Sequence, residues 1–344
     1  MYYDNTISFE ALYKGLNASC RSVRWKDSVT RYEANNLVNT YRLRQSILNN
    51  TYNIDKYQYF VIYEPKRRGI YAPRIKDRQL QHALCDSGLY TDITEHFIRD
   101  NGACQRRRGT DDALTRMKIH LQKYARNYGN SGWYLKCDIH HFFPNINHTI
   151  AKQIAAKYIS DQEVCRKVCD VIDSFNGNKG LGLGSQISQI LAILILNDLD
   201  HYIKEHLHIK HYIRYMDDFI LIHPSKQYLQ YCFSQIKLQL MKLELDLNKK
   251  SELQPVKHGI YFLKWKYLIS PTTKILMLKK PKCLKREKQR LKKIWVLESS
   301  GCRKQGATAE SCIAFIANLK RGNTYYLQLT MYSFYKNLTG SELK

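Results

Sequence analysis

The sequence predicts an α+β protein in which helices surround a few short strands. Apolar residues recur at helical spacing through residues 7–53, and residues 146–174 are also expected to be helical. The clearest strands form a hairpin over residues 211–222, where two runs flank a tight turn. The 344 residues can bury a large core, and no Pro/Gly-rich linker separates independent domains. We therefore expect two or three subdomains within one chain.

The local pattern of apolar residues also predicts further strands and helices. Strands are expected at residues 57–63 and 69–73, and helices at residues 77–89 and from Thr110 onward. An acidic pair directly follows Thr110, but acids in the first turn of a helix are explained by capping and by the helix dipole. We assign no chemistry to this pair.

Two adjacent carboxylates at the tip of the hairpin are the most informative feature of the chain. They belong to the sequence Tyr215-Met216-Asp217-Asp218. Two like charges held side by side are unfavourable unless a cation binds them. Acidic pairs are also common at solvated turns, so the assignment depends on a third acid elsewhere in the chain.

That third acid is Asp138, which ends a short apolar strand and is followed by two aromatic residues. Nucleotidyl transfer by two metal ions, which lie roughly 3.5–4 Å apart, needs acidic ligands from separate elements. In such a site Asp138 and Asp217 would bridge both ions, and Asp218 would lie at the periphery. Carboxylate oxygens are hard ligands, so we expect two Mg²⁺ ions, with Mn²⁺ as an alternative.

The charge of the chain indicates a polyanionic partner. The formal net charge is +25 and the pI is near 9.6. Such a surplus favours binding to nucleic acid over a localisation signal or a merely solvated face. A second basic patch lies at residues 106–108. The densest basic cluster is expected to surround a helix from about Leu284 onward. The residues that we expect to contact nucleic acid belong to this cluster and are Lys279, Lys280, Lys285, Arg286 and Arg290.

Several other classes of protein are disfavoured. The longest strongly apolar run, residues 190–196, is far shorter than the ~20 residues of a membrane span, and the N-terminus does not read as a signal peptide. The ten cysteines lack the paired spacing of a zinc site. We expect reduced thiols and a cytoplasmic protein.

The glycine-rich segment at residues 176–184 superficially suggests a phosphate-binding loop. It lacks the lysine-serine/threonine ending and the preceding strand that such a loop requires. We expect its glycines to let the backbone approach a template base or an incoming nucleotide.

Phe143 is a candidate for sugar selection. It lies five residues after Asp138, on the stretch expected to pass beneath the ribose of an incoming nucleotide. A bulky ring at this place would block a 2′-hydroxyl and favour deoxynucleotides. Packing of the ring in the core is the alternative.

Taken in order, these features resemble the sequence blocks of reverse transcriptases, over about residues 57–293. Segments 63–68 and 76–84 look like the fingers region of the prokaryotic branch that includes group II introns and retrons. The blocks that carry the resemblance are Asp138, Ser188-Gln189 after the glycine-rich turn, the Tyr215-Met216-Asp217-Asp218 hairpin, and Phe262-Leu263. Lys264 replaces the family's glycine after this last pair, which departs from the primer-grip turn.

One detail resembles a narrower group, the diversity-generating retroelement reverse transcriptases. Most of the prokaryotic branch carries glutamine-glycine before a serine-proline pair, whereas this chain has Leu183-Gly184 before Ser188-Gln189. The glutamine normally lines the pocket of the incoming nucleotide, and Leu183 cannot hydrogen-bond. A lost bond of about 1 kcal/mol or more lowers discrimination several-fold to a hundredfold. The resemblance implies that the enzyme misincorporates nucleotides opposite template adenines. Packing of the Leu183 side chain in the core is the alternative interpretation.

The resemblance also implies roles for individual residues. Lys66 and Arg68 would grip the triphosphate, as a point charge and a bidentate guanidinium suit that task. Arg74 and Arg78 are weaker candidates for the same role or for salt bridges. Lys250 is a candidate general acid for pyrophosphate, with a solvated lysine as the alternative. The residues expected around the dNTP are Lys66, Arg68, Phe143, Leu183, Gly184 and Gln189.

The implied architecture is a right-hand polymerase. Its parts would be an N-terminal helical extension (1–55), fingers (56–130), a palm with an antiparallel sheet (131–263, with a fingers insertion at about 151–185), and a basic helical thumb with a C-terminal tail (264–344).

The implied activity is that of an RNA-directed DNA polymerase, a nucleotidyltransferase. It would be bacterial or phage-encoded and would make error-prone cDNA for sequence diversification by mutagenic retrohoming. Its partners would be template RNA, the cDNA/RNA duplex, dNTPs and a small basic accessory variability protein. A retron-like or phage-defence reverse transcriptase is an alternative that neighbouring genes would distinguish. A non-catalytic, maturase-like RNA-binding protein would have a broken aspartate triad, and Phe143 disfavours a viral RNA polymerase.

Overall fold

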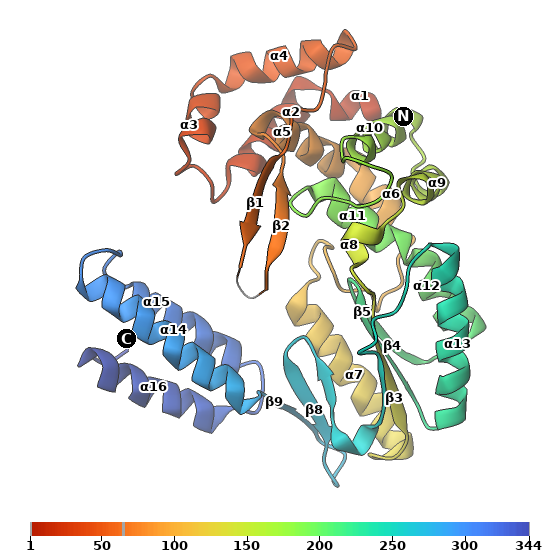
Figure 1. The fold of residues 1–344 in the computed structure, drawn as a ribbon, viewed down its shortest axis with the longest axis vertical. Helices are drawn as coiled ribbons and strands as arrows, with labels where there is room; N and C mark the ends of the chain where they lie inside the picture. The colour runs from red at the N-terminus through yellow and green to blue at the C-terminus, as the bar shows by residue number, and fades with distance from the viewer. Residues whose placement is uncertain (1, 64–65, 344) are drawn as a thin grey trace. The chain divides into compact units, whose positions relative to one another are not determined.

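The computed structural model describes residues 2–63 and 66–343 of the chain (Figure 1). Glu64 and Pro65, which belong to the predicted fingers motif, lie outside the described residues. The chain separates into two compact units, which we describe one at a time. The first comprises residues 1–109, 136–220 and 230–252, and the second comprises residues 110–135, 221–229 and 253–344. The predicted α+β class is confirmed.

The first unit begins with the helices α1 (Tyr3–Thr6), α2 (Phe9–Cys20), α3 (Asp27–Ala34) and α4 (Asn36–Leu48), so the helical pattern predicted over residues 7–53 is confirmed. Ser8 caps α2, because its side chain accepts a hydrogen bond from the Ala11 amide at 3.2 Å. Gly15 lets α2 approach the helix α5 (Ile75–Leu84), since a Cβ at this position would collide with the Gln79 carbonyl.

A β-hairpin precedes α5. Its strands β1 (Gln58–Ile62) and β2 (Arg68–Ala72) are antiparallel and confirm the two strands predicted here (Figure 1). The segment η1 (Cys85–Leu89) then leads into α6 (Tyr90–Thr94), with a kink at Gly88, whose backbone is not helical. The helix predicted at residues 77–89 is confirmed up to this kink.

The region expected to be one helical stretch over residues 146–174 contains two helices. The short helix α8 (Phe142–Asn145) is followed by α9 (His148–Tyr158) and α10 (Gln162–Asp173). The expectation of one stretch was wrong at residues 159–161, because Asp161 starts a new helix: its carboxylate accepts hydrogen bonds from the amides of Glu163 and Val164 at 3.1 and 3.3 Å.

The next helices lead to the predicted hairpin. They are α11 (Gln186–Ile195), α12 (Asn197–His201) and η2 (Tyr202–His206). The strands β4 (His211–Tyr215) and β5 (Asp218–His223) then form the hairpin, with a two-residue connection that requires antiparallel strands. The sheet has the order β4-β5-β3-β6, where β3 is Trp133–Asp138 and β6 is Glu252–Pro255; α13 (Lys226–Lys242) connects β5 to β6.

The second unit contains the long helix α7 (Thr110–Tyr128) and a second sheet. After the short helix η3 (Val256–His258), the strands β7 (Ile260–Phe262), β8 (Trp265–Ile269) and β9 (Ile275–Leu278) form this antiparallel sheet in sequence order. The Tyr267 hydroxyl on β8 donates to the Leu114 carbonyl on α7 at 3.2 Å. This hydrogen bond links β8 to α7 within the second unit.

The expectation of helical structure from Lys264 onward was wrong as far as residue 278. Trp265, Tyr267 and Ile269 are buried while the residues between them are only half-buried, which is the period of a strand. Leu263 and Lys264 have φ angles of 46° and 68°, so both turn residues are left-handed, as a type I′ hairpin requires. The lysine therefore occupies a conformation that glycine adopts more readily.

Three helices complete the second unit: α14 (Pro281–Ser299), α15 (Ala307–Leu319) and α16 (Tyr325–Thr339), drawn in blue in Figure 1. The helix predicted from Leu284 is confirmed, and it begins earlier because Pro281 suits the first helical position. The three helices enclose a core of Leu291, Cys312, Ile316, Leu319, Met331 and Tyr335. No helix in residues 2–63 and 66–343 is long and apolar enough to cross a membrane.

Candidate active site

The first sheet brings together three acids that are distant in the sequence. Asp138 is the last residue of β3, and Asp217 and Asp218 lie at the turn between β4 and β5. The amide of Ile139 donates to the carbonyl of Asp217 at 3.3 Å, because β3 and β5 are neighbours in the sheet. The end of one strand therefore lies against the tip of the hairpin.

The three acids also act on one another electrostatically. Burial raises the pKa of Asp217, and the negative charge of Asp138 raises it further. Burial likewise raises the pKa of Asp218 to about 6, although Lys136 opposes this shift. The Lys136 ammonium lies 3.3 Å from Oδ2 of Asp218. Holding both Asp217 and Asp218 ionised is thus unfavourable without additional positive charge.

Two predicted triphosphate-binding residues act on one of these acids, Asp217. Lys66 and Arg68 are exposed at the β1–β2 hairpin, and their positive charges lower the pKa of Asp217. The hairpin therefore places both cations within electrostatic range of the acidic cluster. Arg74 is exposed beside α5, while burial lowers the pKa of Arg78.

The donor atoms of this cluster fit a divalent cation. Oδ1 of Asp218 is buried and has no hydrogen-bond partner among the residues that the structure describes. A desolvated carboxylate oxygen of this kind is a suitable hard ligand. Within the described part of the chain, no group of three or more His, Cys, Asp or Glu side chains is already arranged as a metal site. The buried carboxylate oxygen of Asp218 nevertheless has the donor chemistry that a divalent cation requires.

Asn248 is a site residue that sequence reasoning missed. Its side-chain amide donates to Oδ2 of Asp138 at 3.0 Å, and its backbone amide donates to the Asp138 carbonyl at 2.7 Å. The only local signal was its position two residues before Lys250, whose own amide donates to Oδ1 of Asn248 at 3.1 Å. The Lys250 side chain is exposed. Asn248 therefore orients the carboxylate of Asp138.

The predicted nucleotide-pocket residues lie along the glycine-rich loop. The Leu183 carbonyl accepts a hydrogen bond from the Tyr71 amide at 2.8 Å. Gly184 has φ +122°, and a Cβ there would lie 2.8 Å from the Tyr71 carbonyl oxygen, so only glycine fits this close approach. Leu183 is half-buried. The loop thus joins β2, and the glycine is required for that contact.

Phe143 and Gln189 lie beside this loop. The Phe143 carbonyl accepts from the Leu181 amide at 2.9 Å, and its ring is half-buried, whereas Phe142 is buried in the core. Gln189 is half-buried on α11, and its Oε1 accepts a long hydrogen bond from the Cys104 thiol at 3.8 Å. Both side chains retain surface for a ligand.

The predicted nucleic-acid residues belong to the second unit. Lys279 lies over the ring of Trp265 at 3.8 Å and Lys280 over the ring of Tyr261 at 3.9 Å. Burial lowers the pKa of Lys279 to about 8. The remaining predicted residues are exposed on α14 and are Lys285, Arg286 and Arg290.

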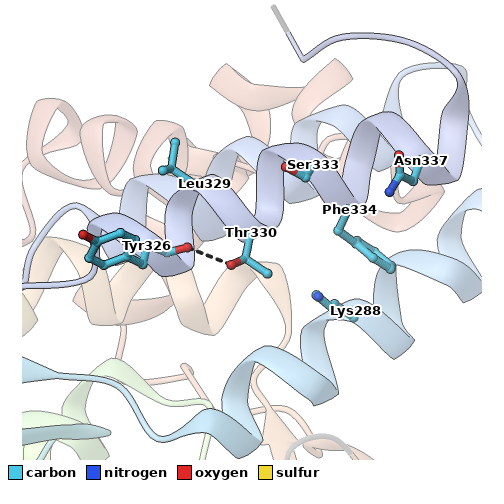
Figure 2. A pocket seen from close by; sticks show the side chains of 7 residues that line it. All are labelled: Lys288, Tyr326, Leu329, Thr330, Ser333, Phe334 and Asn337. Carbon is cyan, nitrogen blue, oxygen red and sulfur yellow. Dashed lines mark hydrogen bonds between the residues drawn. The ribbon is translucent and has the colours of Figure 1, made fainter.

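A hollow of about 460 Å³ lies between α14 and α16 (Figure 2). Lys288 of α14 and Tyr326, Leu329 and Phe334 of α16 contribute to its lining, and the Lys288 ammonium lies 5.1 Å from the Phe334 ring. The Tyr326 side chain is 81% exposed. This hollow therefore places one lysine, Lys288, and an exposed tyrosine ring on the same surface.

The acidic pair at Asp111 and Asp112 lies in the second unit, at the start of α7. Asp111 pairs with Arg321 at 2.6 Å. This ion pair and the position in the first helical turn account for Asp111 without catalytic chemistry.

Comparison with known proteins identifies the family of the chain. Residues 54–263, more than half of the chain, match the family model described as reverse transcriptase (RNA-dependent DNA polymerase). A search of curated proteins gave no match.

Solved structures with a similar fold include two telomerases. The apo telomerase of Candida tropicalis gives a TM-score of 0.54 at 13% identity, covering 83% of this chain and 58% of that one. The Candida albicans telomerase in complex with a fragment of telomeric RNA gives a TM-score of 0.50 at 12% identity, covering 84% and 60%. The chain therefore spans about three fifths of the length of these telomerase chains, and at this identity the likeness concerns the fold alone.

Proposed function

Because the chain belongs to the reverse transcriptase family, we propose that it is an RNA-directed DNA polymerase that makes error-prone cDNA from a retroelement template RNA. The observation that carries the proposal is the acidic cluster. Asp138 meets the turn that bears Asp217 and Asp218, and the charges of Lys66 and Arg68 act on Asp217. Acids beside triphosphate-binding cations are what nucleotidyl transfer needs.

In the proposed reaction the 3′-hydroxyl of the primer attacks the α-phosphate of a dNTP. Divalent metal ions, which the family generally uses, supply activation of the hydroxyl and neutralisation of the developing charge when bound. Asp138 and Asp217 would hold them, with Asp218 at the periphery. Lys66 and Arg68 would orient the triphosphate, and Lys250 would give a proton to the leaving pyrophosphate.

The division into fingers, palm and thumb follows from the same proposal. The β1–β2 hairpin and its helices would be the fingers, and the sheet β4-β5-β3-β6 would be the palm. Helices α14 to α16 would be the thumb, whose lysines and exposed rings suit the template RNA and the cDNA/RNA duplex. We also propose a small basic accessory variability protein as partner, on the basis of the resemblance to diversity-generating retroelements.

The direct test is primer extension by the full chain on a primed RNA of defined sequence, with dNTPs and Mg²⁺. We expect extension that stops when EDTA removes the metal. Absence of extension under all metal conditions, with the protein folded, would contradict the proposed activity.

Sequencing of the cDNA tests the diversifying role. We expect misincorporation opposite template adenines, and we expect Leu183→Gln to lower it by several-fold to a hundredfold because glutamine restores a hydrogen bond in the pocket. Leu183→Met keeps an apolar side chain and serves as the control that leaves the error rate unchanged. A low error rate opposite adenines in the wild type would favour a faithful retron-like or defence enzyme, and equal error rates in the glutamine variant and an error-prone wild type would refute the role of Leu183.

Sugar selection gives a second expected result. Phe143→Ala removes the half-buried ring expected under the ribose, so ribonucleotide incorporation should rise by at least about tenfold, since a lost steric block of a few kcal/mol changes discrimination by that much or more. Phe142→Leu changes the neighbouring core ring and should leave the ratio of ribo- to deoxynucleotide incorporation unchanged. A Phe143→Ala enzyme that still rejects ribonucleotides would show that another residue excludes the 2′-hydroxyl.

Lys279 gives a pH-dependent result. Its lowered pKa of about 8 means that the cation is present below pH 8 and is lost as pH rises through this value. The contribution of Lys279 to oligonucleotide affinity should therefore disappear between about pH 7 and 9. The Lys279→Arg variant stays charged over this range, so its oligonucleotide affinity should be the same at both pH values. Oligonucleotide affinity is measured by fluorescence anisotropy. If the wild type and Lys279→Arg lose affinity to the same extent as the pH rises, the pH effect belongs to other groups.

A further inference from the structure

Arg214 is a fully buried cation of β4 that contacts three other parts of the first unit. Its Nε and Nη2 atoms donate to the two carboxylate oxygens of Asp200 on α12 at 2.7 and 2.6 Å. Nη2 also donates to the Ile193 carbonyl on α11 at 3.1 Å, and Nη1 donates to the Met216 carbonyl at 3.0 Å. A planar guanidinium can satisfy these partners together, and an ammonium cannot.

The contact with Met216 bears directly on the acidic cluster. Met216 is the first residue of the β4–β5 turn and has φ +59°, a left-handed conformation that is unfavourable for a side chain of this kind. Asp217 and Asp218 follow immediately. The Arg214 bond therefore stabilises a strained turn at the peptide that leads into the acids.

Arg214, its hydrogen-bond partners and Tyr212 form one network, in which Asp200 holds the guanidinium on the side away from Met216. Asp200 is fully buried, and its Oδ1 also accepts a hydrogen bond from the Tyr212 hydroxyl at 2.6 Å. The Ile193 carbonyl belongs to α11, the helix that begins just after Leu183-Gly184. The network thus ties the acid-bearing turn to the helix that follows the expected nucleotide pocket.

We propose that Arg214 is a positioning residue: held by Asp200, it fixes the Met216 carbonyl and thereby the turn that presents Asp217 and Asp218 to metal ions. This inference rests on the proposed function of these acids. A buried ion pair that serves only the core would have no effect on metal affinity beyond its effect on stability.

The test compares two variants of the same network by Mn²⁺ binding to the full chain, measured by electron paramagnetic resonance, and by thermal unfolding. Arg214→Lys keeps the charge but cannot reach Asp200 and Met216 together, so Mn²⁺ affinity should fall by about tenfold or more, as for other residues that orient ligands. Tyr212→Phe removes a hydrogen bond to the same carboxylate without touching the turn. It should lower stability and leave Mn²⁺ affinity within about twofold of the wild type. Loss of affinity in both variants in proportion to stability would overturn the proposal.

A further variant covers the case in which Arg214→Lys does not fold. The combination Asp200→Leu, Tyr212→Phe and Arg214→Met removes every polar side chain of the network, and apolar replacement of a buried ion pair is often neutral for stability. We expect this protein to fold and to bind Mn²⁺ about tenfold more weakly. A folded triple variant with wild-type affinity would overturn the role of Arg214. Wild-type Mn²⁺ affinity in Asp217→Asn would instead show that the ions bind elsewhere, which refutes the proposed acidic metal site itself.

Discussion

Asp217→Asn is expected to reduce nucleotide addition by roughly a thousandfold or more, because a ligand that fixes metal-ion charge supplies about 4 kcal/mol of transition-state stabilisation. Asparagine keeps the volume of the side chain and removes its charge. Burial and the charge of Asp138 raise the pKa of the half-buried Asp217 carboxylate, so the loss of its charge should not destabilise the fold. Single-turnover primer extension and thermal unfolding measure the two effects separately.

The matched control for this variant is Asp111→Asn. It makes the same change in the other acidic pair of the chain, where Asp111 is exposed and paired with Arg321. A surface ion pair of this kind contributes at most about 1 kcal/mol to stability, so the rate of nucleotide addition should stay unchanged. Similar losses in both variants would indicate a general effect of charge, and activity retained by Asp217→Asn would contradict the catalytic assignment.

Asn248→Asp is expected to lower activity by about 10–100-fold, the usual cost of disturbing a residue that orients a metal ligand. The wild-type amide donates to Oδ2 of Asp138 at 3.0 Å. An aspartate of the same shape cannot donate when ionised, and it places a second negative charge beside Asp138. Raising the Mg²⁺ concentration should recover part of the rate, because added cation opposes the new repulsion.

The control for this second variant is Asn147→Asp. Asn147 also donates its side-chain amide to a carboxylate, that of Glu244 at 3.2 Å, and it caps α9, a role in which aspartate is equally suitable. We expect its effect on the rate to be less than about twofold, since surface changes of this kind usually stay within ±0.5 kcal/mol. A Mg²⁺ dependence of Asn248→Asp identical to that of wild type would show that Asn248 does not act on Asp138.

Local chemistry made part of the site predictable. Asp138 ends an apolar strand and Asp217-Asp218 occupy a turn between two apolar runs, so hydrophobic pattern and turn position marked both sites in the sequence. The basic pattern after residue 279 likewise predicted helix α14. The break at Asp161 and the strands after Lys264 were missed, although a capping residue marked the break and a period of two marked the strands.

The roles of Asn248 and Arg214 could not be predicted from local sequence. Neither residue lies in a motif that predicts its partner, and the contacts of Asn248 with Asp138 and of Arg214 with Asp200 join separate elements of the fold. Such pairings depend on strand order and on the packing of helices against the sheet.

The amino-acid sequence by itself determined the class of the chain, the positions of its acids and its large positive charge, because hydrophobic periodicity, turn chemistry and charge are local or additive properties. Only the tertiary structure decided which side chains orient those acids. Hydrogen bonds act over about 3 Å, so their partners are known only once the sheet order has brought distant residues to that distance.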